Sequence, residues 1–239
     1  FALGILTYIA IRTFYLKSSE HIVEIFSILS TNSLIVLIGF IDDLFGWRHG
    51  GLSIRSRILM LVFASIPLVI INAGRSGLFG FEFGLIYPLI IIPIGIIGAT
   101  TTFNILAGYN GLEASQGVLI LSALAIVTYR TENSWLSLIC LIMIAALIAF
   151  YFFNKIPAKV FPGDVLTYSI GALIAIIAIF GNIEGIAIFF FIPYILEAIL
   201  KIRGKLKQAS FAKVNSDSSL DEPYEKIYGL EHLAVRILK

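Results

Sequence analysis

Long apolar runs separated by short polar segments make up most of this chain. Eight runs can be placed, near residues 1–16, 22–41, 58–73, 84–106, 118–129, 135–153, 165–180 and 183–202. Each is close to the roughly 20 residues that a helix needs to cross a bilayer, although the first is short and the fifth must draw on residues 111–117 as well. The pattern predicts an all-α polytopic membrane protein with about eight transmembrane helices.

The composition supports this prediction and excludes an ordinary soluble domain. Hydrophobic residues are 59% and charged residues 13% of the 239 residues, whereas a soluble domain carries about 25% charged residues. Mean hydropathy is +0.97. We expect residues 1–203 to form a transmembrane domain and residues 204–239 to form a polar cytoplasmic loop that leads into a truncated last helix. The start at Phe1, without a Met or a charged leader, indicates a fragment rather than a signal peptide.

The basic residues fall mainly on one set of connections. If every apolar run crosses the membrane, residues 42–57, 104–117, 154–164 and the tail after 203 share one face. That face holds 13 of the 17 Lys and Arg residues: Arg48, Arg55, Arg57, Lys155, Lys159, Lys201, Arg203, Lys205, Lys207, Lys213, Lys226, Arg236 and Lys239. By the positive-inside rule this face is cytoplasmic. We therefore expect a multi-pass protein of the cell membrane with its polar clusters on the cytoplasmic side.

Three acids stand at the ends of apolar runs on this face. Asp42 and Asp43 lie side by side after the second run, and Asp164 opens the seventh. Ionisable residues in membrane segments are costly and usually mark functional sites. The simplest interpretation of Asp164 is a helix N-cap. Acids and an Asn that converge on one face would also suit a hard cation, because Mg²⁺ takes one or two carboxylates together with substrate phosphates.

The loop at 103–117 concentrates polar residues and glycines, namely Asn104, Gly108, Asn110, Gly111, Glu113, Gln116 and Gly117. Glycine lets the backbone approach a ligand closely, and an Asn-Gly pair is a turn signal. An ordinary re-entrant connection and a pocket for a polar ligand are both compatible with this pattern.

Together these motifs resemble the polyprenyl-phosphate N-acetylhexosamine 1-phosphate transferases, membrane enzymes that begin lipid-linked glycan assembly. Segment 39–43 is similar to the family's Asp-Asp motif, segment 104–113 to its nucleotide-sugar loop, and segment 161–164 to its Phe-x-Gly-Asp motif. The resemblance covers roughly residues 1–203. Asn-Gly-Leu-Glu at 110–113 and Trp47-Arg48-His49 are closer to the archaeal and eukaryotic UDP-GlcNAc:dolichyl-phosphate GlcNAc-1-phosphate transferases than to the bacterial peptidoglycan translocase, so an archaeal source is expected.

The resemblance implies a reaction and a role for several residues. A dolichyl or other polyprenyl phosphate would attack the β-phosphorus of UDP-GlcNAc and release UMP, either directly or through an enzyme intermediate. Asp164 and Asn104 would hold Mg²⁺, with Mn²⁺ as an alternative, and Arg57 would add positive charge. Asp42 would position or deprotonate the lipid phosphate, with support from Asp43.

The resemblance also implies a donor site and partners. Phe161 and Gly108 would sandwich the uracil, Asn110 would bond its edge, and Glu113 would belong to the same donor loop. The partners implied are a UDP-sugar, a polyprenyl phosphate lipid and the membrane, without nucleic acid; a homodimer is compatible with the sequence. The sugar and the length of the polyprenol stay open.

Some positions depart from the family pattern. Thr101 stands where the family usually has an Asn, three positions before Asn104. The family's basic donor loop is not obvious in the tail, where Lys207, Lys213 and His232 are the candidates.

A transporter or channel is the main alternative from another class. Such proteins place polar groups near the bilayer midplane on broken helices, whereas these acids lie at helix ends on one face. An intramembrane prenyltransferase is a second alternative, but it would carry two acid-rich motifs, and no third acid closely follows Asp42-Asp43.

Overall fold

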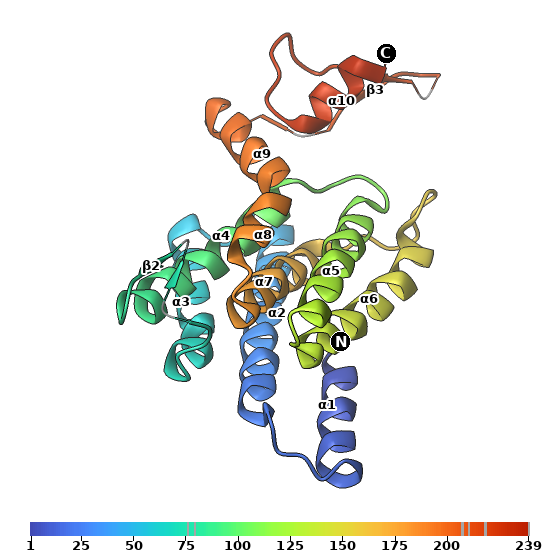
Figure 1. Cartoon of the computed structure of the whole chain (residues 1–239). Coiled ribbons are helices and arrows are strands. Elements are labelled where there is room, and N and C mark those ends of the chain that lie inside the picture. The colour runs from blue at the N-terminus through green and yellow to red at the C-terminus, as the bar shows by residue number, and fades with distance from the viewer. Residues whose placement is uncertain (76, 79, 207, 210, 218, 239) are drawn as a thin grey trace.

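Figure 1 shows a computed structural model of the chain, which describes residues 1–239 except 76, 79, 207, 210, 218 and 239. The side chains at 47–49 and 78 are not described either. The candidate Lys207 and the side chains of Trp47-Arg48-His49 therefore lie outside the described part.

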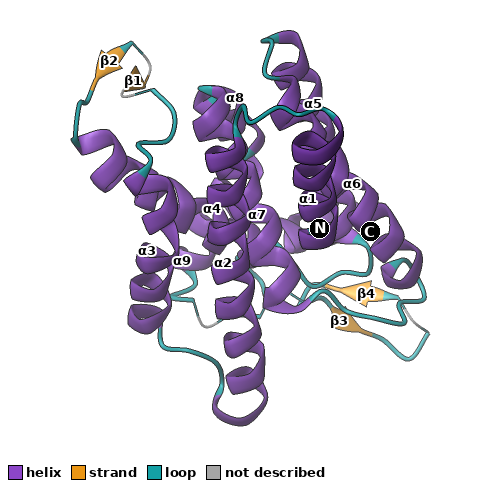
Figure 2. Ribbon diagram, turned by 90° about the horizontal axis from the view of Figure 1, so that it is seen from below, coloured by secondary structure: helices purple, strands orange, loops and turns teal. Residues whose placement is uncertain are grey.

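Helices make up most of the described residues, and the short strands among these residues form two small antiparallel pairs (Figure 2). The elements are α1 (Ala2–Ala10), the π-helix η1 (Ile11–Tyr15), α2 (Ile22–His49), α3 (Ile54–Ile70), β1 (Gly77–Leu78), β2 (Phe81–Glu82), the π-helix η2 (Tyr87–Ile91), α4 (Ile92–Ile105), α5 (Leu112–Arg130), α6 (Ser134–Asn154), α7 (Gly163–Gly181), α8 (Glu184–Phe190), α9 (Ile192–Arg203), β3 (Lys213–Val214), β4 (Leu220–Asp221) and α10 (Leu230–Leu238).

Each of the eight apolar runs forms a helix or a pair of consecutive helices, but not all of these helices are long enough to cross a bilayer. Within the described residues, 5 helices are long and apolar enough: Ile22–Gly46, Tyr87–Ile105, Leu112–Arg130, Ser134–Asn154 and Gly163–Gly181. The pair α8 and α9, bent by 56°, would make a sixth. The helix at Ala2–Tyr15 is shorter, and α3 has 17 residues. The chain is thus an all-α polytopic membrane protein with 5 to 6 candidate spans, fewer than the eight expected.

Helix α7 lies at the centre of the bundle. Of its span, 72% is buried, against 33% to 44% for the other four. Two glycines allow its neighbours to come close. A Cβ on Gly39 of α2 would lie 2.7 Å from the carbonyl oxygen of Asp164, and a Cβ on Gly171 of α7 would lie 2.5 Å from the carbonyl oxygen of Ala99 in α4. Backbone of α2 and α4 therefore packs directly on α7.

The connection from α2 to α3 turns tightly because it uses glycine. Gly50 and Gly51 have φ of +78° and +90°, the left-handed region that glycine adopts without strain. Ser53 then caps α3, since its Oγ accepts a hydrogen bond from the N–H of Ser56 at 3.2 Å. This connection brings the first residues of α3 back beside the end of α2, so that Arg57 of α3 lies close to Asp42 of α2.

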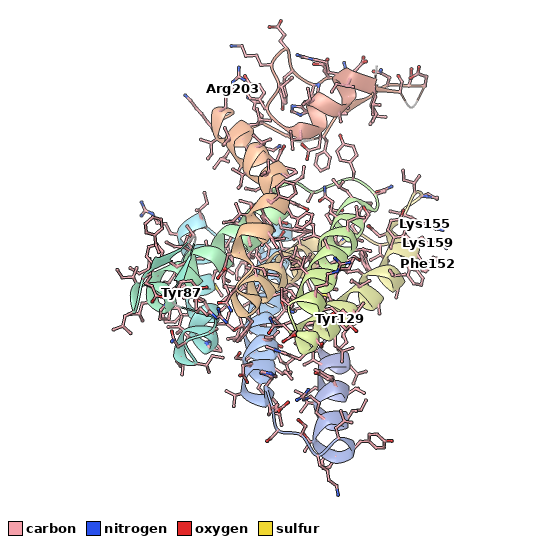
Figure 3. The ribbon with its side chains drawn as sticks, viewed as in Figure 1. Tyr87, Tyr129, Phe152, Lys155, Lys159 and Arg203 are labelled. Atoms are coloured by element: carbon pink, nitrogen blue, oxygen red, sulfur yellow. The ribbon has the colours of Figure 1, made fainter. Side chains whose placement is uncertain are left out.

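The polar connections gather at one end of the bundle, as the alternation of apolar runs predicts. The ends of α2, α4 and α6 and the starts of α3, α5 and α7 lie toward this end, and α9 projects from it into the tail (Figure 1). Figure 3 places Lys155, Lys159 and Arg203 toward this end. At the opposite end the N–H of Arg75 donates to Asn182 Oδ1 at 2.6 Å, and His21 stacks on Trp135 with 4.6 Å between ring centroids.

Helix α9 carries the chain out of the bundle into the tail, which ends in the hairpin β3–β4 and helix α10 (Figure 1). The tail is anchored to α9 by buried charges. Glu197 accepts a hydrogen bond from the N–H of Leu230 at 2.5 Å and pairs with Lys201 at 3.4 Å. Glu231 is 6% exposed beside them. Burial, and then the charge of Glu197, raise the pKa of the Glu231 carboxyl to about 7.

Candidate active site

Asp43 caps helix α7 from a neighbouring helix. Its Oδ1 accepts the N–H of Asp164 at 2.9 Å and its Oδ2 accepts the N–H of Val165 at 3.2 Å. These N–H groups are among the first four of α7, which have no partner within the helix, and a carboxylate suits the positive end of the helix dipole. The interpretation of Asp164 as the N-cap is therefore wrong: Asp164 lies inside the first turn, and Asp43 supplies the cap.

Gly163 makes this contact possible. Its φ is +59°, and a Cβ there would lie 2.6 Å from Asp43 Oδ2. Any side chain at 163 would push the carboxylate away from the helix end. The Gly-Asp pair at 163–164 thus serves the docking of α2 on α7 as well as any chemistry of Asp164.

Asp42 lies in a buried ion pair. It is 2% exposed, and its Oδ2 is 2.7 Å from Nη2 of Arg57. The hydroxyl of Tyr168 donates to the same Oδ2 at 2.8 Å, and the N–H of Leu52 donates to Oδ1 at 2.8 Å. The guanidinium of Arg57 also lies over the ring of Tyr168, 5.9 Å from its centroid. Both oxygens of Asp42 are occupied, so this carboxylate fixes the position of Arg57, α3 and α7 relative to one another.

A pocket of about 430 Å³ opens beside these acids. It is lined by the end of α4, the start of α5, the start of α7 and the tail, with Asn104, Ala107, Gly108, Tyr109, Glu113, Phe161, Pro162, Gly163, Asp164, Thr167 and Phe211 on its surface. Asn104 faces α7, since its Oδ1 accepts a hydrogen bond from Thr167 Oγ1 at 2.7 Å. The fold therefore brings the two expected metal ligands, Asp164 and Asn104, to one pocket.

The loop that contains Gly108 and Gly111, called the glycine loop below, is held in place by two buried polar side chains. Glu113, 1% exposed, accepts the N–H of Gly108 at 2.6 Å. Asn154, 0% exposed, accepts the N–H of Gly111 at 3.0 Å and donates from Nδ2 to the carbonyl of Val160 at 2.9 Å. Asn154 thus links the glycine loop to the segment that carries Phe161. These bonds set the distance between two walls of the pocket.

The structure separates the expected donor residues into lining and supporting groups. Gly108 and Phe161 line the pocket, and Phe161 is 70% exposed. Glu113 contributes to the lining but mainly holds the loop. Asn110 is exposed on the loop and is absent from the described pocket lining. Arg57 lies at the ion pair with Asp42.

The tail candidates have different environments. Lys213 is exposed on β3. His232 is 2% exposed and is used in anchoring, since its Nδ1 accepts the N–H of Tyr228 at 3.3 Å and its Nε2 lies 3.1 Å from the carbonyl oxygen of Ala209.

Four residues of the site were missing from the sequence prediction. Thr167 and Tyr168 follow Asp164 by three and four positions, which places them on its face of α7, so that spacing could have found them. Asn154 ends an apolar helix as a lone amide, a weak signal. Nothing in the sequence marks Phe211, because the path of the tail decides its position.

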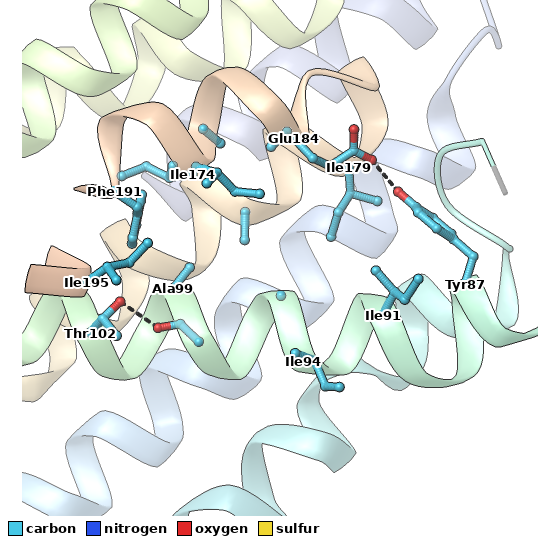
Figure 4. Close-up of a pocket in the computed structure, with 16 residues that line it drawn as sticks. Tyr87, Ile91, Ile94, Ala99, Thr102, Ile174, Ile179, Glu184, Phe191 and Ile195 are labelled. Atoms are coloured by element: carbon cyan, nitrogen blue, oxygen red, sulfur yellow. Dashed lines mark hydrogen bonds between the residues drawn. The ribbon is translucent and has the colours of Figure 1, made fainter. Parts of the chain in front are cut away.

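An apolar groove is formed by α4, α7 and the bent pair α8 and α9 (Figure 4). Its volume is about 340 Å³, and its lining is mostly apolar, including Ile91, Gly98, Ile174 and Phe191. At one end the hydroxyl of Tyr87 donates a hydrogen bond to Glu184. The groove offers an apolar surface between helices that are candidate membrane spans.

Comparison with known proteins gives consistent matches. The model of the family described as glycosyl transferase family 4 matches residues 25–182. A protein of Saccharolobus solfataricus, provisionally named UDP-N-acetylglucosamine–dolichyl-phosphate N-acetylglucosaminephosphotransferase, is 38% identical over 92% of this chain and 68% of its own length. A protein of Sulfolobus acidocaldarius with the same provisional name is 32% identical over 89% of this chain and 65% of its own length.

A more distant similarity extends to bacteria. The phospho-N-acetylmuramoyl-pentapeptide-transferase of Streptococcus agalactiae is 30% identical over 76% of this chain and 56% of its own length. The chain thus spans between about half and two thirds of the length of these curated relatives.

Proposed function

Because the chain belongs to glycosyl transferase family 4, we propose that it transfers N-acetylglucosamine 1-phosphate from UDP-GlcNAc to a polyprenyl phosphate of the dolichyl type and releases UMP. The observation that carries this proposal is the convergence of Asp42, Asp43 and Asp164, from helices α2 and α7, at the edge of a pocket lined by Gly108 and Phe161. Charged groups for phosphate chemistry thus adjoin a site for a planar base. The provisional names of the two archaeal relatives support the choice of donor and acceptor.

The donor pocket suits a uridine nucleotide. The exposed ring of Phe161 offers one face for stacking, and Gly108, with φ of +116°, lets a base approach the backbone of the other wall. Stacking of a base on an aromatic side chain contributes about 1–3 kcal/mol in nucleic-acid complexes. Asn110, which is exposed outside the described pocket lining, would have to turn toward the pocket to bond the edge of the base.

The oxygen ligands of Asp164 and Asn104, where the donor pyrophosphate would lie, suit Mg²⁺. Asp164 supplies a carboxylate and Asn104 an amide oxygen to the same pocket. Within the described residues, no group of three or more His, Cys, Asp or Glu side chains forms a metal cage. This donor set suits an ion that keeps several waters and binds substrate phosphates. When bound, Mg²⁺ would neutralise charge on the donor pyrophosphate.

Arg57 and Asp42 would serve the acceptor. In the proposed reaction an oxygen of the lipid phosphate attacks the β-phosphorus, the bond from that phosphorus to the bridging oxygen breaks, and UMP leaves. Arg57 would attract the lipid phosphate, and Asp42 would hold Arg57 in place. With its oxygens engaged by three partners, Asp42 is better suited to positioning than to taking a proton. The apolar groove beside α7 would hold part of the polyprenyl chain.

The charge distribution supports a cytoplasmic site. The acids, the pocket and the tail lie at the end of the bundle that carries most of the Lys and Arg residues. We therefore propose a multi-pass protein of the cell membrane, with up to eight spans if the shorter helices also cross it, and with the reaction on the cytoplasmic face.

The test is release of UMP by the full-length protein, assayed with a polyprenyl phosphate and a panel of UDP-sugars. We expect UMP release to require both the lipid and Mg²⁺, to be fastest with UDP-GlcNAc, and to be lost in Asp164→Asn. The matched control Asp217→Asn changes an exposed tail acid and should retain activity. Solute flux in vesicles without nucleotide, and no UMP release with any UDP-sugar, would instead support a transporter.

A further inference from the structure

The ring of Phe211, from the tail, lies on Gly108 in the donor pocket. A Cβ built on Gly108 would lie 2.6 Å from Cε1 and 3.0 Å from Cζ of this ring. Both residues line the pocket that also contains Phe161. Phe211 therefore covers the face of Gly108 on which a stacked base would rest.

Hydrogen bonds on both sides of Phe211 hold it there. The N–H of Ala212 donates to the hydroxyl of Tyr109 at 3.2 Å, on the pocket side. The N–H of Ala209 donates to the hydroxyl of Tyr224 at 3.2 Å, and the carbonyl of Ala209 lies 3.1 Å from His232 Nε2. The backbone of the tail is thus tied to the glycine loop and to its own anchor, which gives the ring a defined position.

We propose that Phe211 is a placeholder for the base of the donor: its ring occupies the base position in the nucleotide-free chain, and the base displaces it on binding. This inference rests on the proposed function, because it takes Gly108 as one wall of a uridine site. A phenyl ring and a pyrimidine ring are both planar and close in size, so one can replace the other against Gly108. With 58% of Phe211 exposed, its contact is weak enough for a ligand to displace.

If Phe211 is a placeholder, its removal should change nucleotide affinity in the direction opposite to that of most mutations in a binding pocket. Because only molecules with an open pocket bind the base, the apparent affinity equals the affinity of the open pocket multiplied by the fraction of molecules in which the pocket is open. Removal of the ring should therefore tighten nucleotide binding, whereas removal of a stacking wall should weaken it.

The experiment is calorimetric titration of the full-length protein in detergent with UMP. We expect Phe211→Ala to lower the Kd by roughly threefold to tenfold, the size appropriate to a partly buried phenyl ring. Phe161→Ala should raise the Kd by roughly tenfold or more, because it removes the stacking wall. The control Phe81→Ala removes another exposed ring, in β2 at the opposite end, and should leave the Kd unchanged.

A second measurement follows the tail itself. UMP should speed hydrogen exchange at the N–H of Ala212 in the wild type, because displacement of Phe211 breaks the bond to Tyr109. A higher or unchanged Kd in Phe211→Ala, or slower exchange at Ala212 with UMP, would overturn the placeholder. A folded wild type that binds neither UMP nor UDP-GlcNAc would instead contradict the proposed function, and the placeholder with it.

Discussion

A single methyl group at Gly39 should damage the site, although Gly39 is not among the described residues that line the pocket. Gly39 lies one helical turn before Asp43 on α2, on the face that packs against α7. In Gly39→Ala the new Cβ would lie 2.7 Å from the carbonyl oxygen of Asp164, 2.8 Å from its carbonyl carbon and 2.9 Å from the nitrogen of Val165. All of these are backbone atoms, so no side chain can rotate to make room.

The size of the effect follows from these distances. Ordinary contact begins near 3.4 Å, so α2 and α7 must separate locally by up to about 0.7 Å. Overpacking of this kind costs about 1–3 kcal/mol, partly offset by the roughly 0.5–1 kcal/mol that Ala gains over Gly inside a helix. The same separation would stretch the bonds from Asp43 to the N–H groups of Asp164 and Val165, now at 2.9 Å and 3.2 Å. Activity should fall more than stability does.

Gly46→Ala is the matched control, because it lies on the same helix and a Cβ there would meet nothing within 4 Å. Thermal unfolding in detergent and UMP release would be measured for both variants. We expect Gly46→Ala to equal the wild type or to gain slightly in stability, with full activity. A Gly39→Ala protein as stable and as active as Gly46→Ala would refute the argument that close backbone packing at Gly39 maintains the site.

The remaining predictions test other parts of the site. Asp164→Asn should lower turnover by about a hundredfold or more while thermal unfolding changes little, since Asp43 supplies the cap; near-normal turnover at limiting Mg²⁺ would remove Asp164 from the chemistry. Asn154→Ala should weaken UMP binding in calorimetry, because it leaves the buried N–H of Gly111 without its partner, at about 1–3 kcal/mol, and removes the bond that ties this loop to Val160. The pKa of Glu231 is raised to about 7 from an ordinary 4.5, so docking of the tail should be strongest below pH 4.5 and should weaken as the pH rises toward 7. Hydrogen exchange at the N–H of Leu230, corrected for its intrinsic rate, should show this trend in the wild type and lose it in Glu231→Gln. Cysteines placed at Ser53 and Ser115 should react with an impermeant reagent only from the cytoplasmic side, and labelling from opposite sides would contradict a shared site.

The sequence predicted the meeting of distant motifs because helices that alternate across a membrane return their polar ends to the same side. Asp42, Asp43, Asn104 and Asp164 were identified as a cluster for this reason, and the fold brings them together. The identity of each partner could not be predicted. The choice of Asp43 as cap of α7, in place of Asp164, depends on how deeply Gly39 lets α2 approach, which is a property of two packed helices.

The number of spans and the path of the tail were also beyond the sequence. Apolar runs show where helices form, but they do not show how long each helix is. Helix α3 has 17 residues and is not among the candidate spans, and the bend between α8 and α9 divides another run into two short helices. Phe211 reaches Gly108 because of anchors at Leu230 and Ala212, which are set by contacts far along the chain. Local pattern carries no information on such contacts.

The bond between Asp43 and the start of α7 also has a consequence for biosynthesis. The two partners are 121 residues apart in the chain, and at roughly 5–20 residues per second a ribosome needs about 6–24 s to make that stretch. During this interval the Asp43 carboxylate lacks its amide partners. The arrangement around Asp43 therefore cannot form until α7 has been made and has docked on α2. A chain that ends before α7 would therefore lack both the cap and the packing of α2 that depends on it.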